Sequence, residues 1–280
     1  MKKITSILFW IGCVLLSFQA NAQLFSENFE TGLGQFANEA GNTVDWQIDT
    51  GLFQDGTQSV LNAYGSNSNN ILYQTNPIDL SAANNPQLSF WHIAKLEGGY
   101  DEAIVEISTD GGATFTPFTD IDYLGSGITV SAGTFNEDAY GQWGTGSETP
   151  ANAWWKREFF DLSAYNTATV VVRFRLTSDG SVQREGWYLD NVEILEITCP
   201  KPSEIVIDQI TANAADISWT SGGSETEWEI LYGPAGFNPE TEGNAVQDTD
   251  GTIGETITGL NPATDYDVYV RAICGAGNES

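Results

Sequence analysis

The chain has 280 residues, and its 38 acidic residues against 10 Lys and Arg give a formal net charge of −28 at pH 7. A surface this acidic repels nucleic acid and anionic lipid, which excludes both as expected partners, and it favours divalent cations. The length fits two domains of ordinary size.

The N-terminal segment has the three parts of a secretory signal peptide. Lys2 and Lys3 precede an apolar run over residues 4–18, and Ala20-Asn21-Ala22 is a small-residue cleavage site. Cys13 within the run would suit lipidation, but the downstream cleavage site favours ordinary cleavage. We therefore expect residues 1–22 to be removed and the protein to be secreted or displayed at the cell surface. No segment of the mature chain is long and apolar enough to predict a membrane span.

Residues 24–197 read as an all-β domain. Short strand-like runs recur between clusters of Gly, Asn and Ser, a spacing typical of a sandwich or jelly roll. The predicted strands cover residues 44–48, 59–64, 70–75, 87–94, 102–108, 155–162, 169–176 and 186–195. In the 169–176 run, one face carries only apolar residues and should line the core. These residues are Val170, Val172, Phe174 and Leu176.

Two acids of this domain lie among apolar residues on predicted strand faces. Because side chains alternate along a strand, Asp190 should point the same way as Tyr188, Val192 and Ile194. Near the start of the mature chain, Glu27 likewise lies between two phenylalanines. An unpaired buried carboxylate costs several kcal/mol, so two such acids at opposite ends of one domain predict a shared cation.

The predicted cation is a structural Ca²⁺ held by Glu27 and Asp190. Ca²⁺ takes about six to eight oxygen ligands, so backbone carbonyls and further acids such as Glu30 or Asp101 would have to contribute. The alternative is that Asp190 caps a turn or accepts backbone N–H bonds.

A long stretch rich in Gly, Ser and Thr lies between Asp122 and Asn152 and carries several aromatic residues. A loop of this length inside a compact domain is usually functional or mobile. Its aromatic rings could stack on the apolar faces of sugars, or they could fix the loop to the sandwich. The residues predicted to contact a glycan or another extracellular ligand are Tyr100, Tyr140, Trp143 and Trp154.

Catalytic signatures are missing from the sequence. His92 is the only histidine, which excludes a zinc-protease motif with two histidines, and its core-like strand predicts a hydrogen-bonded interior histidine. The segment 108–115 fits an Asp-box pattern once, and Asp110-Gly111 should supply a hairpin turn. No nucleophile elbow or phosphate-binding loop stands out. We expect this chain to have no enzymatic activity.

A domain boundary is predicted at residues 198–202, where two prolines in three residues punctuate the chain. Trp219 then falls on the second of the strands that follow, and Tyr266 closes the segment LNPATDY at the start of a late strand, as in a tyrosine corner. Residues 199–280 resemble a fibronectin type III domain, which is an immunoglobulin-like sandwich. The strands predicted there lie at residues 204–210, 214–220, 227–233, around 246, 255–260 and 265–274.

Two cysteines remain in the mature chain, Cys199 and Cys274. An even pair in an exported protein favours a disulfide. Six antiparallel strands would also return the end of the last one to the pole where Cys199 enters. The pattern lacks the seventh strand of the fibronectin type III fold, so we expect the sequence to be a fragment of a longer protein.

The N-terminal domain carries a second resemblance. Residues 154–195 are similar to the jelly-roll modules of MAM-like domains, and above all to the non-catalytic module of secreted metalloproteases of the immune inhibitor A type. The resemblance implies a concanavalin A-like or jelly-roll sandwich that accompanies other domains in secreted bacterial proteins, often with a structural Ca²⁺ between its first and last strands. Animal MAM domains have cysteines where this chain has none, so their adhesion role is not transferred. The residues that carry the similarity are Trp155, 161–163, 173–174, 178–180 and 186–192.

Together these patterns predict an exported, non-catalytic binding or adhesion protein. Its jelly-roll module would recognise a glycan or an extracellular protein, and its fibronectin type III domain would act as a spacer. Two alternatives stay open. The chain could be the ancillary region of a longer secreted hydrolase of the metalloprotease type, or a purely structural segment of the cell surface.

Overall fold

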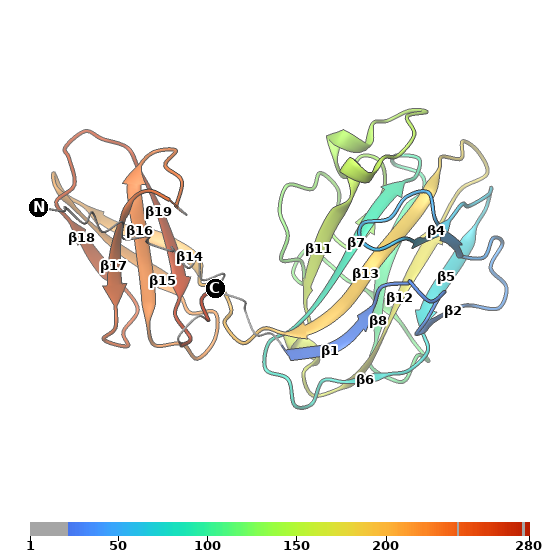
Figure 1. Cartoon of the computed structure of the whole chain (residues 1–280), viewed down its shortest axis with the longest axis horizontal. Coiled ribbons are helices and arrows are strands. Elements are labelled where there is room, and N and C mark those ends of the chain that lie inside the picture. Colours follow the sequence, from blue (N-terminus) through green and yellow to red (C-terminus); the bar gives the residue numbers. More distant parts are fainter. Residues whose placement is uncertain (1–21, 240, 276–277) are drawn as a thin grey trace, which may run out of the picture. The chain divides into compact units, whose positions relative to one another are not determined.

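The computed structural model describes residues 22–239, 241–275 and 278–280, which belong to two compact units divided between Ile197 and Thr198 (Figure 1). The predicted signal peptide lies outside the described residues except for Ala22, which begins the first strand. Strands form nearly all of the regular structure. Among the described residues, no helix is long and apolar enough to cross a membrane. The predicted all-β fold, with one sandwich following another, is confirmed.

One sheet of the N-terminal unit has the strand order β11-β7-β13-β4-β3. The first strand, β1, is added beside the second half of β13, whereas β4 pairs with its first half. The strands are β1 (Ala22–Glu27), β3 (Gln47–Asp49), β4 (Ser59–Asn62), β7 (Pro86–Lys95), β11 (Lys156–Asp161) and β13 (Gly186–Glu196).

The second sheet of this unit has the order β10-β8-β12-β5-β2, with β6 pairing with β12 and β9 with β8. All strand pairs in both sheets are antiparallel. The strands are β2 (Phe36–Asn38), β5 (Asn69–Gln74), β6 (Ile78–Asp79), β8 (Glu102–Ser108), β9 (Thr116–Pro117), β10 (Thr134–Phe135) and β12 (Thr169–Thr177). Short 3₁₀ helices lie at η1 (Gly141–Trp143), η2 (Asn152–Trp154) and η3 (Ser163–Tyr165).

The two sheets share one aromatic core. The ring of Phe174 on β12 lies 5.2 Å from Phe90 on β7 and 5.7 Å from Trp187 on β13, measured between centroids. Edge-to-face contacts of this kind stabilise by about 1 kcal/mol beyond the area they bury. The apolar face predicted for β12 is confirmed, because all four of its residues are buried.

A β-bulge in β13 overturns the alternation predicted for that strand. The register against β7 shifts between Asp190 and Glu193, and Asn191 has a left-handed φ of 46°. An extra residue sends every following side chain to the opposite face. The core face is therefore made by Trp187 and Leu189 before the bulge and by Val192 after it. Asp190 points away from Val192, contrary to the prediction.

The C-terminal unit contains two three-stranded sheets, β14-β15-β18 and β17-β16-β19. All six strands predicted for it are present: β14 (Ser203–Ile210), β15 (Ala214–Thr220), β16 (Trp228–Pro234), β17 (Asn244–Asp248), β18 (Glu255–Thr258) and β19 (Tyr266–Ala272). Trp219 and Trp228 meet at 5.5 Å between ring centroids in its core. The hydroxyl of Tyr266 accepts the N–H of Asn261 at 3.0 Å, as a tyrosine corner requires.

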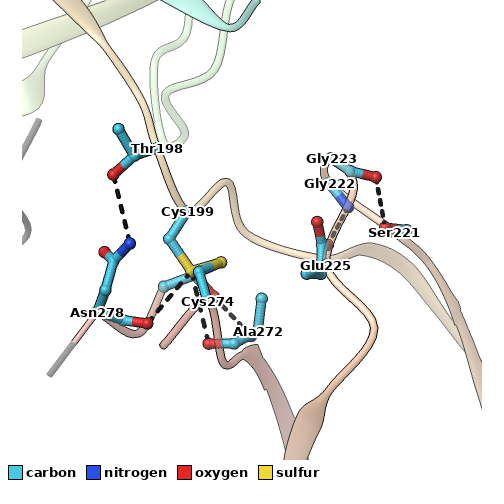
Figure 2. Close-up of a disulfide and its surroundings, with 10 residues drawn as sticks. Thr198, Cys199, Ser221, Gly222, Gly223, Glu225, Ala272, Cys274 and Asn278 are labelled. Carbon is cyan, nitrogen blue, oxygen red and sulfur yellow. Dashed lines mark hydrogen bonds between the residues drawn. A yellow bond between two sulfur atoms is a disulfide. The ribbon is translucent and has the colours of Figure 1, made fainter. Parts of the chain in front are cut away.

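The predicted disulfide between Cys199 and Cys274 is confirmed, with 5.7 Å between the two Cα atoms (Figure 2). It joins the segment that enters the C-terminal unit to the end of β19, beside Ala272. Asn278 Nδ2 donates to Thr198 Oγ1 at 3.4 Å close to the bridge. The link therefore ties the entry of this unit to its last described strand.

Candidate functional site

Glu27, one of the predicted metal ligands, is satisfied by the turn that follows it. Its Oε1 accepts the N–H of Phe29 at 2.9 Å, and its Oε2 accepts the N–H of Gln35 at 2.7 Å. Gly34, with a φ of 54°, passes so close to this carboxylate that a Cβ atom there would overlap it. The side chain thus organises the connection from β1 to β2.

Asp190 is completely buried and also accepts backbone N–H groups. Gln54 donates to Oδ2 at 2.9 Å and Asn191 donates to Oδ1 at 2.8 Å. Burial raises the pKa of Asp190 to about 6, and the nearby charge of Glu30 adds to the rise. The alternative left open for Asp190, that it accepts backbone N–H bonds, is what the structure shows.

The structure does not bring Glu27 and Asp190 together as predicted. Glu27 pairs across the strands with Val192, which lies on the face opposite Asp190 because of the bulge. Glu30 is the predicted ligand within electrostatic reach of Asp190, and it accepts the N–H of Thr57 at 2.9 Å. The calcium ion predicted at Glu27 and Asp190, with Glu30 as a further candidate ligand, stays a prediction, and Glu30 is close enough to raise the pKa of Asp190.

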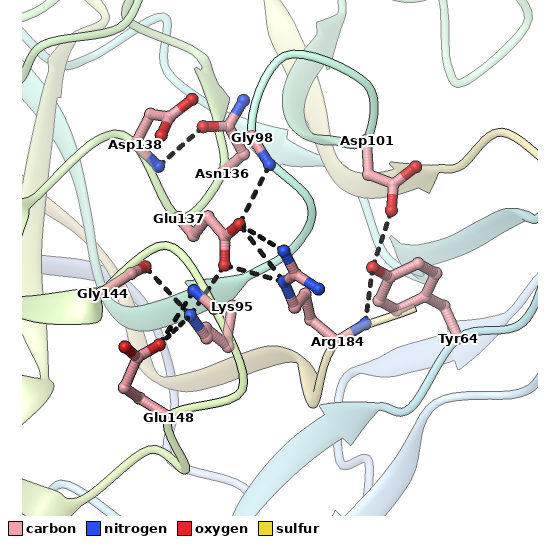
Figure 3. Close-up of polar contacts among 11 residues, drawn as sticks. Tyr64, Lys95, Gly98, Asp101, Asn136, Glu137, Asp138, Gly144, Glu148 and Arg184 are labelled. Carbon is pink, nitrogen blue, oxygen red and sulfur yellow. Dashed lines mark hydrogen bonds and ion pairs between the residues drawn. The ribbon is translucent and has the colours of Figure 1, made fainter. Parts of the chain in front are cut away.

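Asp101, the fourth predicted ligand, belongs to a different acidic centre. Among the residues that the structure describes, Glu97, Asp101 and Asp179 bring carboxylate oxygens within 4.8 Å of one another. Asp101 is completely buried, and its Oδ2 accepts the hydroxyl of Tyr64 at 2.7 Å (Figure 3). Its Oδ1 accepts the N–H of Asp179 at 3.0 Å.

Sequence reasoning missed Glu97 and Asp179 as members of this centre. Both lie in turns, one after β7 and one after β12, and only the pairing of β8 with β12 brings these turns to the same end of the sheet. A usable signal was the acid next to glycine in both turns, Glu97-Gly98 and Asp179-Gly180.

A buried ion-pair network lies beside this centre (Figure 3). Lys95 is fully buried, and its Nζ donates to Glu137 Oε2 at 2.7 Å and to the carbonyl of Gly144 at 2.9 Å. Arg184 donates to the same carboxylate at 3.0 Å. Burial alone would raise the pKa of Glu137, but Arg184 and Lys95 hold it below its ordinary value. The network fixes the long loop to β7 and to the loop after β12.

The four aromatic residues predicted to contact a ligand differ in exposure. Tyr100 is 67% exposed, whereas the other three pack against the sandwich. Trp143 is fully buried against His92, and its indole N–H donates to the carbonyl of Trp154 at 2.9 Å. Tyr140 donates its hydroxyl to Glu158 at 2.7 Å, and Trp154 packs on the core. The loop aromatics therefore fix the loop to the sandwich, and Trp143 has no surface on which a sugar could stack.

His92 is the interior histidine that the sequence predicts. Its Nδ1 accepts the indole N–H of Trp187 at 3.3 Å, so the proton sits on Nε2, which donates to Glu158 at 2.9 Å. Glu158 also accepts the hydroxyls of Tyr123 and Tyr140. These hydrogen bonds lower the pKa of Glu158 although burial alone would raise it. The side chain is buried, and no nucleophile is among its hydrogen-bond partners in the described chain.

We call the surface formed by residues 64–68, 97–101 and 178–184 the loop face. Its segments are bound to one another, since Ser178 Oγ donates to the carbonyl of Gly65 at 2.7 Å and Gln183 Nε2 donates to Ser66 Oγ at 2.9 Å. Two large side chains stand out from it, Tyr100 at 67% exposure and Val182 at 45%. The loop face is thus a fixed surface with a protruding aromatic ring.

Comparison with known proteins identifies the C-terminal unit. Residues 200–280 match the model of the fibronectin type III domain. Similar solved structures include a fibronectin type III domain of human collagen XX, 21% identical, with a TM-score of 0.24 over 26% of this chain and 75% of that one. The FN5 domain of Drosophila Lar is 22% identical, with a TM-score of 0.24 over 27% of this chain and 78% of that one.

A short segment also matches a curated protein, Bacillopeptidase F of Bacillus subtilis (strain 168). The two are 43% identical over 47 residues, which is 17% of this chain and 3% of the relative. The chain therefore spans a small part of that protein's length, and the match assigns no family to the whole chain. The family model and the tyrosine corner agree on the C-terminal unit, and residues 200–280 form a fibronectin type III domain.

Proposed function

We propose that this chain is an extracellular, non-catalytic binding segment. The N-terminal sandwich presents the ligand surface, and the fibronectin type III domain acts as a binding or spacer module. The family match supports the second part, and the disulfide is of the kind that persists in oxidising compartments outside the cytosol.

The observation that carries the proposal is the setting of Tyr100. The ring is exposed, yet the turn beneath it is held by the buried Asp101 and by the N–H of Gly98, which donates to Glu137 at 3.4 Å. A turn that is already held in place loses little conformational entropy on binding. The apolar face of the Tyr100 ring suits the C–H face of a sugar ring.

The charge of the chain narrows the ligand class. Its formal net charge is −28, so an anionic glycan would approach a field of like charge. We therefore propose a neutral glycan as the ligand, with an extracellular protein as the alternative partner.

A catalytic role has little support from the sandwich. The single histidine is enclosed by Trp187, Trp143 and Glu158, and its hydrogen bonds are the ones an interior histidine makes. The fibronectin type III domain is a generally non-catalytic module.

The short match to Bacillopeptidase F supports a second candidate, in which the segment is an ancillary region of a longer secreted hydrolase. The reading frame beyond Ser280 separates the two candidates. A catalytic domain encoded there supports the hydrolase, whereas further fibronectin type III repeats support adhesion or a structural surface segment.

A glycan array probed with the chain tests the binding proposal. We expect neutral sugars to bind, and Tyr100→Ala to weaken that binding by about fivefold, the equivalent of about 1 kcal/mol for one stacked ring. Tyr269→Ala is the matched control, because Tyr269 is an exposed tyrosine of the other unit. Carbohydrate recognition is refuted if no sugar binds above background, and the loop face is refuted as its site if both variants bind as the native chain does.

A further inference from the structure

The acidic centre of the loop face contains an unsatisfied carboxylate. The Oε2 atom of Glu97 is buried, and none of the described residues offers it a hydrogen bond. The same residue lies with Asp101 and Asp179 in the group whose oxygens come within 4.8 Å of one another. In its ionised form, a buried and unpaired carboxylate oxygen close to two other acids is unfavourable unless a positive charge compensates it.

Both carboxylate oxygens of Asp101 already accept hydrogen bonds from other parts of the loop face. The hydroxyl of Tyr64 accepts the N–H of Arg184 at 3.0 Å and donates its own hydrogen to Asp101 Oδ2 at 2.7 Å. Asp101 Oδ1 accepts the backbone N–H of Asp179 at 3.0 Å. Both oxygens therefore act as acceptors. These contacts leave each oxygen with a free lone pair.

The two neighbouring cations already bind another carboxylate. Lys95 and Arg184 both bind Glu137, at 2.7 Å and 3.0 Å, so two cations share one carboxylate between them. Counting Glu137 with the three acids of the centre, four carboxylates face two cations, and Glu148 adds a further negative charge 3.5 Å from Lys95. The deficit is two positive charges or more, which a divalent cation would supply.

We propose that Glu97, Asp101 and Asp179 bind a calcium ion within the loop face. Oxygens on opposite sides of a Ca²⁺ ion are about 4.6 to 5.2 Å apart, so oxygens within 4.8 Å of one another can share one ion. The donors are all hard oxygens, with no histidine or cysteine in the group, which favours Ca²⁺ over zinc or copper.

The proposed ion joins two connections that are distant in the sequence. Glu97 and Asp101 belong to the turn between β7 and β8, whereas Asp179 belongs to the loop between β12 and β13. The centre is separate from the site predicted at Glu27 and Asp190, since Asp190 faces the loop around Gln54. The proposed calcium site does not depend on glycan binding.

Calorimetric titration of the metal-free chain with Ca²⁺ tests this site, together with melting curves in calcium and in chelator. We expect Ca²⁺ to bind and to raise the melting temperature of the N-terminal unit. Glu97→Gln should weaken binding at this site by at least about tenfold. In chelator the same variant should melt no lower than the native chain, because it removes a repulsive charge. Asp179→Asn keeps the backbone N–H that binds Asp101 and should weaken calcium binding without disturbing the fold.

Two controls separate this site from other acids. Glu102→Gln removes an exposed carboxylate next to Asp101 and should leave the titration unchanged. Asp190→Asn should leave binding at the loop face intact. The site is refuted if the native chain binds no Ca²⁺, or if Glu97→Gln and Asp179→Asn both bind Ca²⁺ as tightly as the native chain.

Discussion

Buried acids show how far a residue's role can be predicted from its neighbours in sequence. Glu27 and Asp190 were identified as compensated acids because they lie among apolar residues, and both are indeed buried and compensated. The compensating groups are backbone N–H donors from the turn after Glu27 and from the loop around Gln54. Which backbone amides reach a carboxylate depends on loop conformation, and alternation along a strand carries no information about it.

Asp190 should make the free energy of unfolding depend on pH. Its folded-state pKa of about 6 lies above the ordinary value of 3.8, so the folded protein holds this proton more tightly than the unfolded chain. The group therefore adds stability below about pH 4, and this contribution, about 3 kcal/mol, is lost as the pH rises through about 6. In chelator, the native chain should lose stability relative to Asp190→Asn across that interval.

Carbon-detected NMR of the carboxyl groups measures the pKa of Asp190 directly. We expect Asp190 to titrate near pH 6 in the metal-free protein. A midpoint at or below 4 would show that burial does not destabilise its charged form.

Strand β13 shows what is predictable at the scale of an element. Apart from β1, the apolar patterns located every strand of four or more residues to within a few residues, because half-buried strands carry period two. The sequence pattern does not predict the bulge at Asn191, because a single inserted residue hardly changes the composition of a strand and shows only in its pairing. The pattern also does not predict the short strands β2, β6, β9 and β10, because two or three residues are too few to show a period.

The bulge should depend on the left-handed conformation of Asn191. Valine is strongly disfavoured at a φ of 46°, whereas glycine adopts it freely. We expect the free energy of unfolding of Asn191→Val, measured by denaturant titration, to be lower than that of Asn191→Gly by about 1 to 2 kcal/mol.

Both variants lose the hydrogen bond from Asn191 Nδ2 to Gln54 Oε1, so their difference isolates the backbone effect. Equal stability of the two variants would mean that the bulge relaxes when the residue is changed.

At the scale of the whole molecule, the disulfide should stabilise one unit only. Cys199 and Cys274 both belong to the C-terminal unit, and the described N-terminal unit contains no cysteine. Reduction should destabilise the fibronectin type III domain by about 4 kcal/mol in the chain-entropy model and leave the sandwich of residues 22–197 unchanged.

Calorimetry with and without reductant checks this expectation. On reduction, the transition of the C-terminal unit should move to lower temperature. The transition of the N-terminal unit should keep its position. A shift of both transitions would show that the two units unfold together.

The candidate site was less predictable than the fold. Asp101 and Tyr100 were singled out from the sequence, but Glu97, Asp179 and the Lys95 network join them only because β8 pairs with β12 and the long loop folds back on β7. Contacts between segments so far apart in sequence follow from topology, which the strand patterns do not specify.

A calcium ion held by Glu97, Asp101 and Asp179 is the centre of the loop face as we propose it. The most direct test of this claim is the anomalous difference density of crystals grown in calcium. We predict a peak bounded by the carboxylates of Glu97, Asp101 and Asp179, lost in crystals of Glu97→Gln. Crystals saturated with calcium that show no peak between these three residues would contradict the claim.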